Sequence, residues 1–91
     1  MAEKLQARIV INNRLGLHAR PASMFAQTAN RFASSIQITR GNLTVDGKSI
    51  LGLMTLGAPM GSQLDLVIDG DDAGEMLAAI NALVDSNFGE A

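Results

Sequence analysis

The 91-residue chain has no cysteine, tryptophan or tyrosine, and its three phenylalanines bring the aromatic share to only 3%. The lack of cysteine excludes disulfide bonds, thiolate nucleophiles and cysteine-rich metal sites. The scarcity of aromatic rings leaves few surfaces on which nucleic-acid bases can stack. A formal net charge of -2 argues further against electrostatic binding of DNA or RNA. The composition therefore disfavours a nucleic-acid-binding protein.

Long apolar runs are also lacking. The sequence predicts neither a signal peptide nor a transmembrane span, so we expect a cytoplasmic protein that does not insert into membranes. The length favours a single domain over residues 1–91. Hydrophobic residues make up 47% of the chain, which is enough to build a core and disfavours disorder.

The periodicity of apolar residues predicts seven elements. Alternation with a period of two predicts strands at about 5–11, 35–39, 43–45 and 64–69. Helical spacing predicts helices at about 19–32, 49–56 and from 73 to a point before 89. The order strand-helix-strand-strand-helix-strand-helix predicts an α+β fold, with helices on one face of the sheet. A further strand should lie between the parallel strands of each strand-helix-strand unit.

The short second helix is expected to begin after Ser49, which is a good N-cap residue. Its spacing predicts that Ile50, Leu53 and Leu56 face the core. Leu51 and Met54 would then point partly outward.

The single histidine, His18, lies where the first strand ends and the first helix begins. Backbone N–H groups in the first turn of a helix have no helical acceptor and attract anions. Arg20 adds a planar guanidinium suited to phosphate, and His18 supplies a nitrogen nucleophile. The pattern predicts an imidazole that accepts a phosphoryl group, with the N–H groups of Ala19 and Arg20 contacting the phosphoryl oxygens.

Ordinary interpretations of the same residues stay open. A lone histidine in a small domain is more often a surface or structural residue, and without it Arg20 would be a simple surface charge. One imidazole without a second histidine or a cysteine makes no metal site, so no metal is expected.

Two further features also have two interpretations. Ser49 is an ordinary N-cap, yet a serine at a helix start can also carry a regulatory phosphate that the helix dipole stabilises. Leu17, Leu51 and Met54 belong either to the core or, if exposed, to an apolar partner-binding surface near the histidine.

Two runs of sequence resemble a known family. The run from Gly16 to Ala22, GLHARPA, resembles the active-site motif of HPr, the histidine-containing phosphocarrier family of the phosphoenolpyruvate-dependent phosphotransferase system. The run from Lys48 to Gly57, KSILGLMTLG, resembles the family's second signature, around its regulatory serine. Both runs stand in the family's order, and the resemblance extends over about residues 4–88. Together the two motifs are highly specific.

The resemblance implies an open-faced β-sandwich, in which three helices cover one side of a four-stranded antiparallel sheet. It implies that His18 takes a phosphoryl group on Nδ1 from enzyme I and passes it to IIA domains, while Arg20 stabilises the group in transit. It implies a monomeric carrier rather than an enzyme with its own turnover, and no cofactor.

The resemblance also identifies Ser49 as the position that an HPr kinase/phosphorylase would modify. A phosphate there would add about -1.5 to -2 charges beside Leu51 and Met54 and weaken partner binding. One alternative is therefore a regulatory effector that acts through the phosphorylated serine. A plain ferredoxin-like interaction or RNA-binding domain is another.

Leu15 departs from the pattern of many sugar-branch members, which have a small polar residue there. We therefore expect backbone groups or solvent, rather than a neighbouring side chain, to orient the imidazole. Leu15 also makes the first motif similar to that of the nitrogen-branch carrier NPr, whereas the Ser49 region looks more like the sugar branch. The branch stays open.

Overall fold

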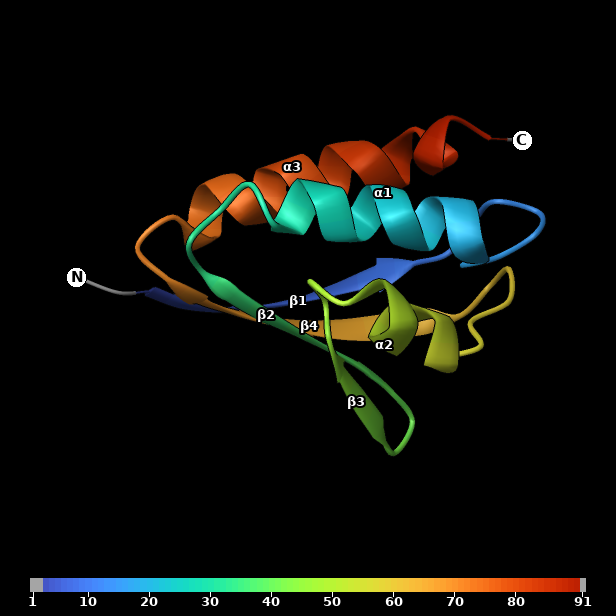
Figure 1. Cartoon of the computed structure of the whole chain (residues 1–91), viewed down its shortest axis with the longest axis horizontal. Coiled ribbons are helices and arrows are strands. Elements are labelled where there is room, and N and C mark those ends of the chain that lie inside the picture. Colours follow the sequence, from blue (N-terminus) through green and yellow to red (C-terminus); the bar gives the residue numbers. More distant parts are fainter. Residues whose placement is uncertain (1–2, 91) are drawn as a thin grey trace.

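The computed structural model describes residues 3–90 and contains four strands, three α-helices and a final 3-10 turn (Figure 1). In chain order the elements are β1 (Glu3–Val10), α1 (Ala19–Ala29), β2 (Ser35–Arg40), β3 (Leu43–Asp46), α2 (Ile50–Thr55), β4 (Gln63–Gly70), α3 (Ala73–Asp85) and η1 (Asn87–Gly89). The seven predicted elements are confirmed in type and order. None of the helices in residues 3–90 is long and apolar enough to cross a membrane.

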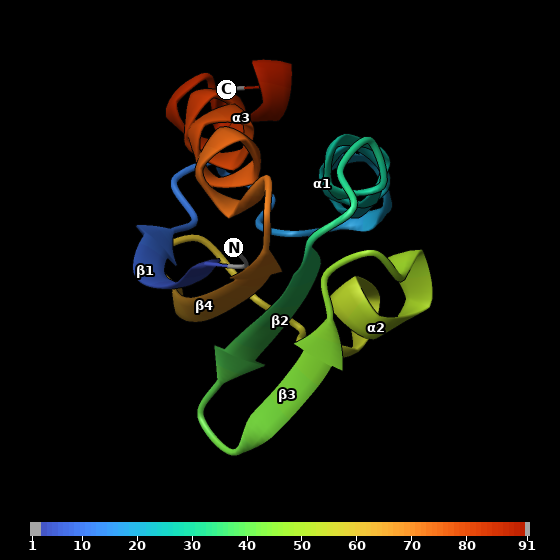
Figure 2. The same cartoon turned by 90° about the vertical axis from the view of Figure 1, so that its left-hand side faces the viewer.

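The four strands form one antiparallel sheet in the order β1-β4-β2-β3. Because β4 is antiparallel to both of its neighbours, β1 and β2 are parallel with β4 between them, as the sequence predicts. The three helices lie on one face of the sheet and leave the other face open (Figure 2). The expected α+β open-faced sandwich is confirmed.

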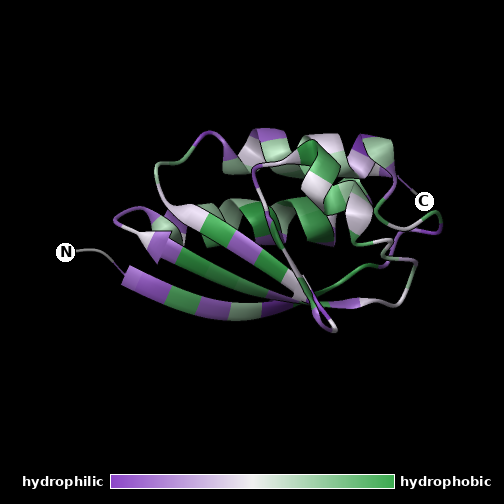
Figure 3. Cartoon of the chain, turned by 60° about the horizontal axis from the view of Figure 1, so that its bottom comes forward, coloured by the Kyte–Doolittle hydropathy of each residue, from purple (hydrophilic) through white to green (hydrophobic). Residues whose placement is uncertain are grey.

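The core lies between the sheet and the helices. Polar and apolar residues largely alternate along β1, β2 and β4 (Figure 3), and in these strands the buried positions alternate with exposed ones. Leu64, Leu66 and Ile68 of β4 are fully buried, and they pack in one cluster with Phe25 of α1 and Ile80 of α3. The burial of these residues fixes the position of α1, whose first turn carries the histidine.

The predicted orientation of α2 is correct for four of five residues. Leu53 and Leu56 are buried, and Leu51 and Met54 are exposed, but Ile50 is 41% exposed and the prediction that it faces the core is wrong. Ile50 and Leu56 lie about 120° apart around a helix. The face that buries Leu53 and Leu56 therefore turns Ile50 toward solvent.

The turn η1 follows from no apolar periodicity in the sequence. Phe88 is buried there, and both Asn87 and Phe88 have positive φ, at 53° and 56°. This turn follows α3 at the end of the molecule where α1 begins (Figure 1). It thereby places Glu90 at the same end of the molecule as the histidine.

The carboxylate of Asp72 ties the start of α3 to the segment between α1 and β2. It accepts hydrogen bonds from the backbone N–H groups of Ala33 and Ser34, at 2.9 Å each, and from the Ser34 hydroxyl. The Ser34 hydroxyl, followed by the two N–H groups, lowers the pKa of Asp72 below its usual range. A carboxyl with a lowered folded-state pKa adds stability above its unfolded pKa, and this stability is lost as the pH falls through the lowered value.

We therefore expect the free energy of unfolding to fall as the pH is lowered from about 5 toward 2, and less steeply in Asp72→Asn than in the native chain. Urea denaturation at a series of pH values measures both slopes. Glu90 also has a lowered pKa, so part of the slope should remain. Asp71→Asn, at the exposed neighbouring position, is the control for the change in charge. Equal slopes in Asp72→Asn and the native chain would contradict the assignment.

Candidate functional site

His18 is the residue immediately before α1, with φ -80° and ψ -171° in the extended region. Its carbonyl accepts the first hydrogen bond of the helix from the Ala22 N–H, at 3.0 Å, but its side chain makes no capping bond. The imidazole therefore projects from the start of α1, and about a third of it is exposed. The backbone arrangement agrees with the one expected from the sequence.

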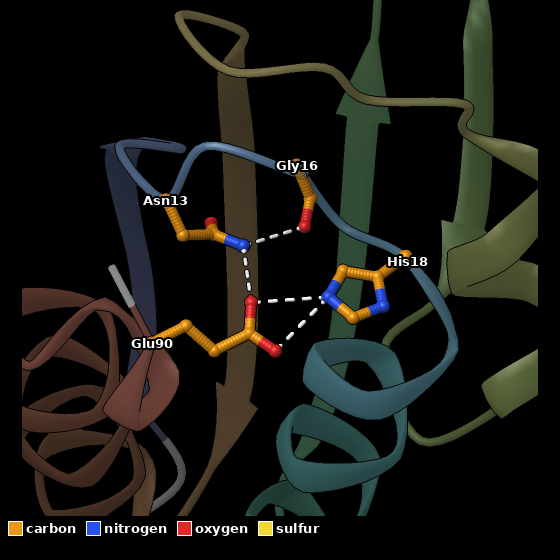
Figure 4. Close-up of polar contacts among 4 residues, drawn as sticks. All are labelled: Asn13, Gly16, His18 and Glu90. Atoms are coloured by element: carbon orange, nitrogen blue, oxygen red, sulfur yellow. Dashed lines mark hydrogen bonds and ion pairs between the residues drawn. The ribbon is translucent and has the colours of Figure 1, made fainter.

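The imidazole meets a carboxylate from the other end of the chain (Figure 4). Nε2 of His18 lies 3.0 Å from both Oε1 and Oε2 of Glu90. The side-chain amide of Asn13 donates to Glu90 Oε1 at 3.0 Å and to the carbonyl of Gly16 at 2.6 Å. Nδ1 of the ring lies on the side away from Glu90.

Sequence reasoning missed Asn13 and Glu90. Asn13 is one of the polar residues that follow the predicted first strand, and Glu90 lies 72 positions from His18. No periodicity links residues so distant in the chain. The one available signal was the end of the apolar alternation after residue 11.

The contact with Glu90 corrects the expectation drawn from Leu15. Leu15 is exposed and provides no group that could orient the ring. The ring is nevertheless contacted by a side chain, the Glu90 carboxylate, and not only by backbone groups or solvent. The hydrogen bond from His18 is the largest cause that lowers the pKa of Glu90. The bond from Asn13 and the charges of His18 and Arg20 act in the same direction, against the effect of burial.

The loop that carries His18 is held by the segment after α2. The Leu17 N–H donates to the Ala58 carbonyl at 2.8 Å, and Gly61 donates to the carbonyl of Ile11 at 2.6 Å. Gly16 has φ +71°, and its backbone lies so close to Ala58 that no side chain fits between them. The second loop therefore fixes the position of the histidine loop.

Ala19 and Arg20 are the first two residues of α1, so their N–H groups are at the same helix end as the imidazole, and both residues are exposed. Among the described residues, no group of three or more histidine, cysteine, aspartate and glutamate side chains could hold a metal ion. A depression between β1 and β4 is lined by Arg8, Asp65 and their neighbours and includes none of the candidate residues. The candidate residues at the histidine site therefore lie at the start of α1 and not in this depression.

Ser49 is the N-cap of α2, as predicted, and its Oγ accepts the Gly52 N–H at 3.0 Å. Leu51 is 77% exposed and Met54 is also exposed. Leu17 is only 4% exposed and belongs to the core, so its assignment to a partner surface is wrong. The reason is the bond from its N–H to Ala58, which holds this loop residue against the body of the protein.

The structure is a small α+β open-faced sandwich with a partly exposed imidazole at the start of α1. Comparison with known proteins identifies the family to which such a chain belongs. The family model for the PTS HPr component phosphorylation site matches residues 5–86. The chain belongs to the HPr family.

Its relatives share most of their length with it. The phosphocarrier protein HPr of Neisseria meningitidis serogroup A is 44% identical over 94% of this chain and 97% of its own. The phosphocarrier protein NPr of Shewanella violacea is 43% identical over 97% of both chains. The crystal structure of HPr-C-His from Thermoanaerobacter tengcongensis superposes with a TM-score of 0.91, at 44% identity, and covers 96% of this chain and 98% of that one.

Proposed function

We propose that this protein is a phosphocarrier of the phosphotransferase system. It takes a phosphoryl group on Nδ1 of His18 from enzyme I and passes it to IIA domains, acting as a cytoplasmic monomer and not as an enzyme with its own turnover. The observation that carries the proposal is the imidazole of His18, which projects uncapped from the start of α1 beside the first-turn N–H groups and Arg20. Membership of the HPr family supports it.

The transfer step requires little beyond position and charge. The lone pair of Nδ1 attacks phosphorus in line with the bond to the donor; the N–P bond forms as the donor's bond to phosphorus breaks, and that electron pair stays on the donor. The N–H groups of Ala19 and Arg20 and the guanidinium of Arg20 stabilise the charge on the three phosphoryl oxygens. The reverse sequence, with an acceptor in place of the donor, releases the group.

The acceptors proposed are IIA domains of the sugar branch, with those of the nitrogen branch as the alternative. The chain is almost equally similar to an HPr and to an NPr, so both kinds of acceptor belong in the assay. A chain that transfers to only one of them is thereby assigned to that branch.

Ser49 is proposed as a site of regulatory phosphorylation by an HPr kinase/phosphorylase. Ser49 precedes α2, so a phosphate on its side chain can accept the Gly52 N–H in place of the hydroxyl oxygen. The phosphate also adds negative charge next to the exposed Leu51 and Met54. Mass spectrometry of the protein isolated from its own cells measures this, as acid-stable phosphate on residue 49. Its absence under every growth condition would leave Ser49 with the N-cap role alone.

The exposed side chains of Leu51 and Met54 are proposed as part of the surface that enzyme I and IIA domains contact. Apolar side chains exposed on a short helix gain free energy when a partner covers them. We expect Leu51→Asp to weaken binding to enzyme I about tenfold, which is ~1.4 kcal/mol. Isothermal titration calorimetry with purified enzyme I measures the change.

The control for that variant is Asn81→Asp, which adds the same charge at an exposed position on α3. In Figure 2, α3 lies on the far side of α1 from α2. Equal binding by Leu51→Asp and Asn81→Asp would remove α2 from the partner surface.

The proposed function is tested directly with enzyme I and labelled phosphoenolpyruvate. The native chain should become labelled, lose the label in acid, and pass it to a purified IIA domain. Failure of native, folded protein to take up label from enzyme I of the same source would overturn the proposal.

A further inference from the structure

We propose that Glu90 is a positioning residue for His18. Its carboxylate accepts the Nε2–H of the imidazole, keeps the proton on that nitrogen and leaves the Nδ1 lone pair free, while Asn13 holds the carboxylate in place. The assignment of the tautomer stands by itself, and its consequence for phosphoryl transfer rests on the proposed function.

The position of the proton follows from the partners. An ionised carboxylate only accepts hydrogen bonds, and both of its oxygens lie 3.0 Å from Nε2. The ring must therefore donate from Nε2. A neutral imidazole carries a single N–H, so Nδ1 is then the nitrogen with the free lone pair, on the side of the ring away from Glu90 (Figure 4).

Asn13 fixes the orientation of the carboxylate. Its side chain is completely buried, and its amide nitrogen lies between two acceptors, Glu90 Oε1 and the Gly16 carbonyl. If the amide were turned by 180°, its oxygen would face two other acceptor oxygens. The amide nitrogen must therefore be the atom that faces them. Asn13 thus links the loop that carries His18 to the carboxylate that contacts its ring.

The segment that carries Glu90 is held in place as well. Phe88 is buried, and the N–H groups of Gly89 and Glu90 donate to the carbonyls of Ser86 and Asn87, at 2.9 Å each. A bulky residue with positive φ, as in Phe88, persists only where the surrounding packing determines it. This turn therefore delivers Glu90 to a fixed place rather than to one of many.

A solvent-exposed ion pair between mobile side chains contributes little. Here the side chain of Glu90 is only 14% exposed and has two partners, His18 and Asn13. These contacts distinguish it from the pair of Arg8 and Asp65 on the open face of the sheet, where both side chains are more than half exposed.

The arrangement removes the need for proton transfer during the reaction. When the neutral ring with its proton on Nε2 forms the N–P bond through Nδ1, the ring becomes a cation that still carries the same proton. The Glu90 carboxylate, 3.0 Å away, neutralises that cation. When the phosphoryl group leaves, the ring returns to the neutral form with the proton where it was. The negative charge of Glu90 also repels phosphoryl oxygens, which Arg20 and the N–H groups of the helix start must offset.

The first test is nitrogen-15 NMR of the His18 ring above about pH 8, where an ordinary histidine is neutral. In the native chain we expect the proton to be on Nε2 and its exchange with water to be slowed. In Glu90→Ala the ratio of the Nε2–H to the Nδ1–H tautomer should fall about tenfold or more, because a charge-assisted hydrogen bond is lost. An unchanged ratio and an unchanged exchange rate in a folded Glu90→Ala protein would overturn the proposal.

A second variant separates the hydrogen bond from the charge. Glu90→Gln keeps a carbonyl oxygen that accepts from Nε2 but loses the charge, so the tautomer ratio should lie between those of the native chain and Glu90→Ala. The rate of phosphoryl uptake from enzyme I should still fall about tenfold, because the ring cation has lost its counter-charge. The control is Asp85→Asn, which removes the same charge at an exposed position at the end of α3 and should behave as native.

The outcomes distinguish the two proposals. If the native chain takes up no label from enzyme I, the phosphocarrier function fails, while the tautomer measurement still decides the role of Glu90. If the native chain is labelled and both Glu90 variants match it in rate and tautomer ratio, Glu90 has no positioning role and the phosphocarrier function stands.

Discussion

His18→Ala should take up no phosphoryl group from phosphoenolpyruvate and enzyme I, under conditions in which the native chain is fully labelled. His18 is the only histidine in the sequence, and there is no cysteine to replace it as a nucleophile. Removal of the imidazole leaves Arg20 and the first-turn N–H groups with no nucleophile beside them. The measurement is transfer of labelled phosphate, with acid treatment to separate phosphohistidine from phosphoserine.

Two variants serve as controls. Arg20→Gln keeps the nucleophile and loses the guanidinium, so it should still become labelled but about tenfold to a hundredfold more slowly. Ser49→Ala should be labelled at the native rate. Acid-labile label on His18→Ala would show that the phosphoryl group is carried elsewhere, and a native rate in Arg20→Gln would remove Arg20 from the site.

Gly16→Ala should destabilise the fold by about 2–5 kcal/mol, the sum of the costs of a left-handed backbone and of overpacking. A Cβ at this position would lie 2.5 Å from the Ala58 carbonyl oxygen and 2.8 Å from Cα of Pro59. Both are backbone atoms, which cannot turn aside as a flexible side chain does. Because φ is +71°, an alanine is strained even without these contacts. Urea denaturation measures the loss.

The matched control is Gly41→Ala in the turn between β2 and β3. Its φ of +60° is similar, but no atom lies within 4 Å of the added Cβ. It should therefore show only the backbone cost, about 1–2 kcal/mol. If the two variants lose the same stability, the contact between the histidine loop and residues 58–59 does not constrain Gly16. The protein that remains folded in Gly16→Ala should also take up phosphate more slowly, because the loop that carries His18 has moved.

The elements that carry a clear apolar period were predictable from the sequence. β4 is an example, because its buried residues Leu64, Leu66 and Ile68 recur at every second position, as a sheet covered on one face requires. The N-cap at Ser49 was predictable for a local reason, since a serine side chain satisfies a helix N–H only three residues away. Ile50 was wrongly predicted because the apolar face of a six-residue helix can rotate by tens of degrees without a change in sequence pattern.

Only the part of the site around His18 was predictable from the sequence. His18 and Arg20 lie within three residues of each other, so a short motif reveals them. Leu17 shows the limit of that motif, because a loop residue becomes buried or exposed according to the segment that packs on it, here Ala58.

The amino-acid sequence determined the order of the elements, the face that the longer elements turn to the core, and the helix end on which the histidine lies. These depend on contacts between near neighbours in the chain and on a periodicity that each element carries within itself. The fold in three dimensions decided the partner of the imidazole. Glu90 reaches His18 only because α3 and the turn around the buried Phe88 return the chain to the start of α1, and Asn13 holds its amide between two acceptors that come from different ends of the chain. Such a contact depends on the packing of the whole molecule, which no local pattern records.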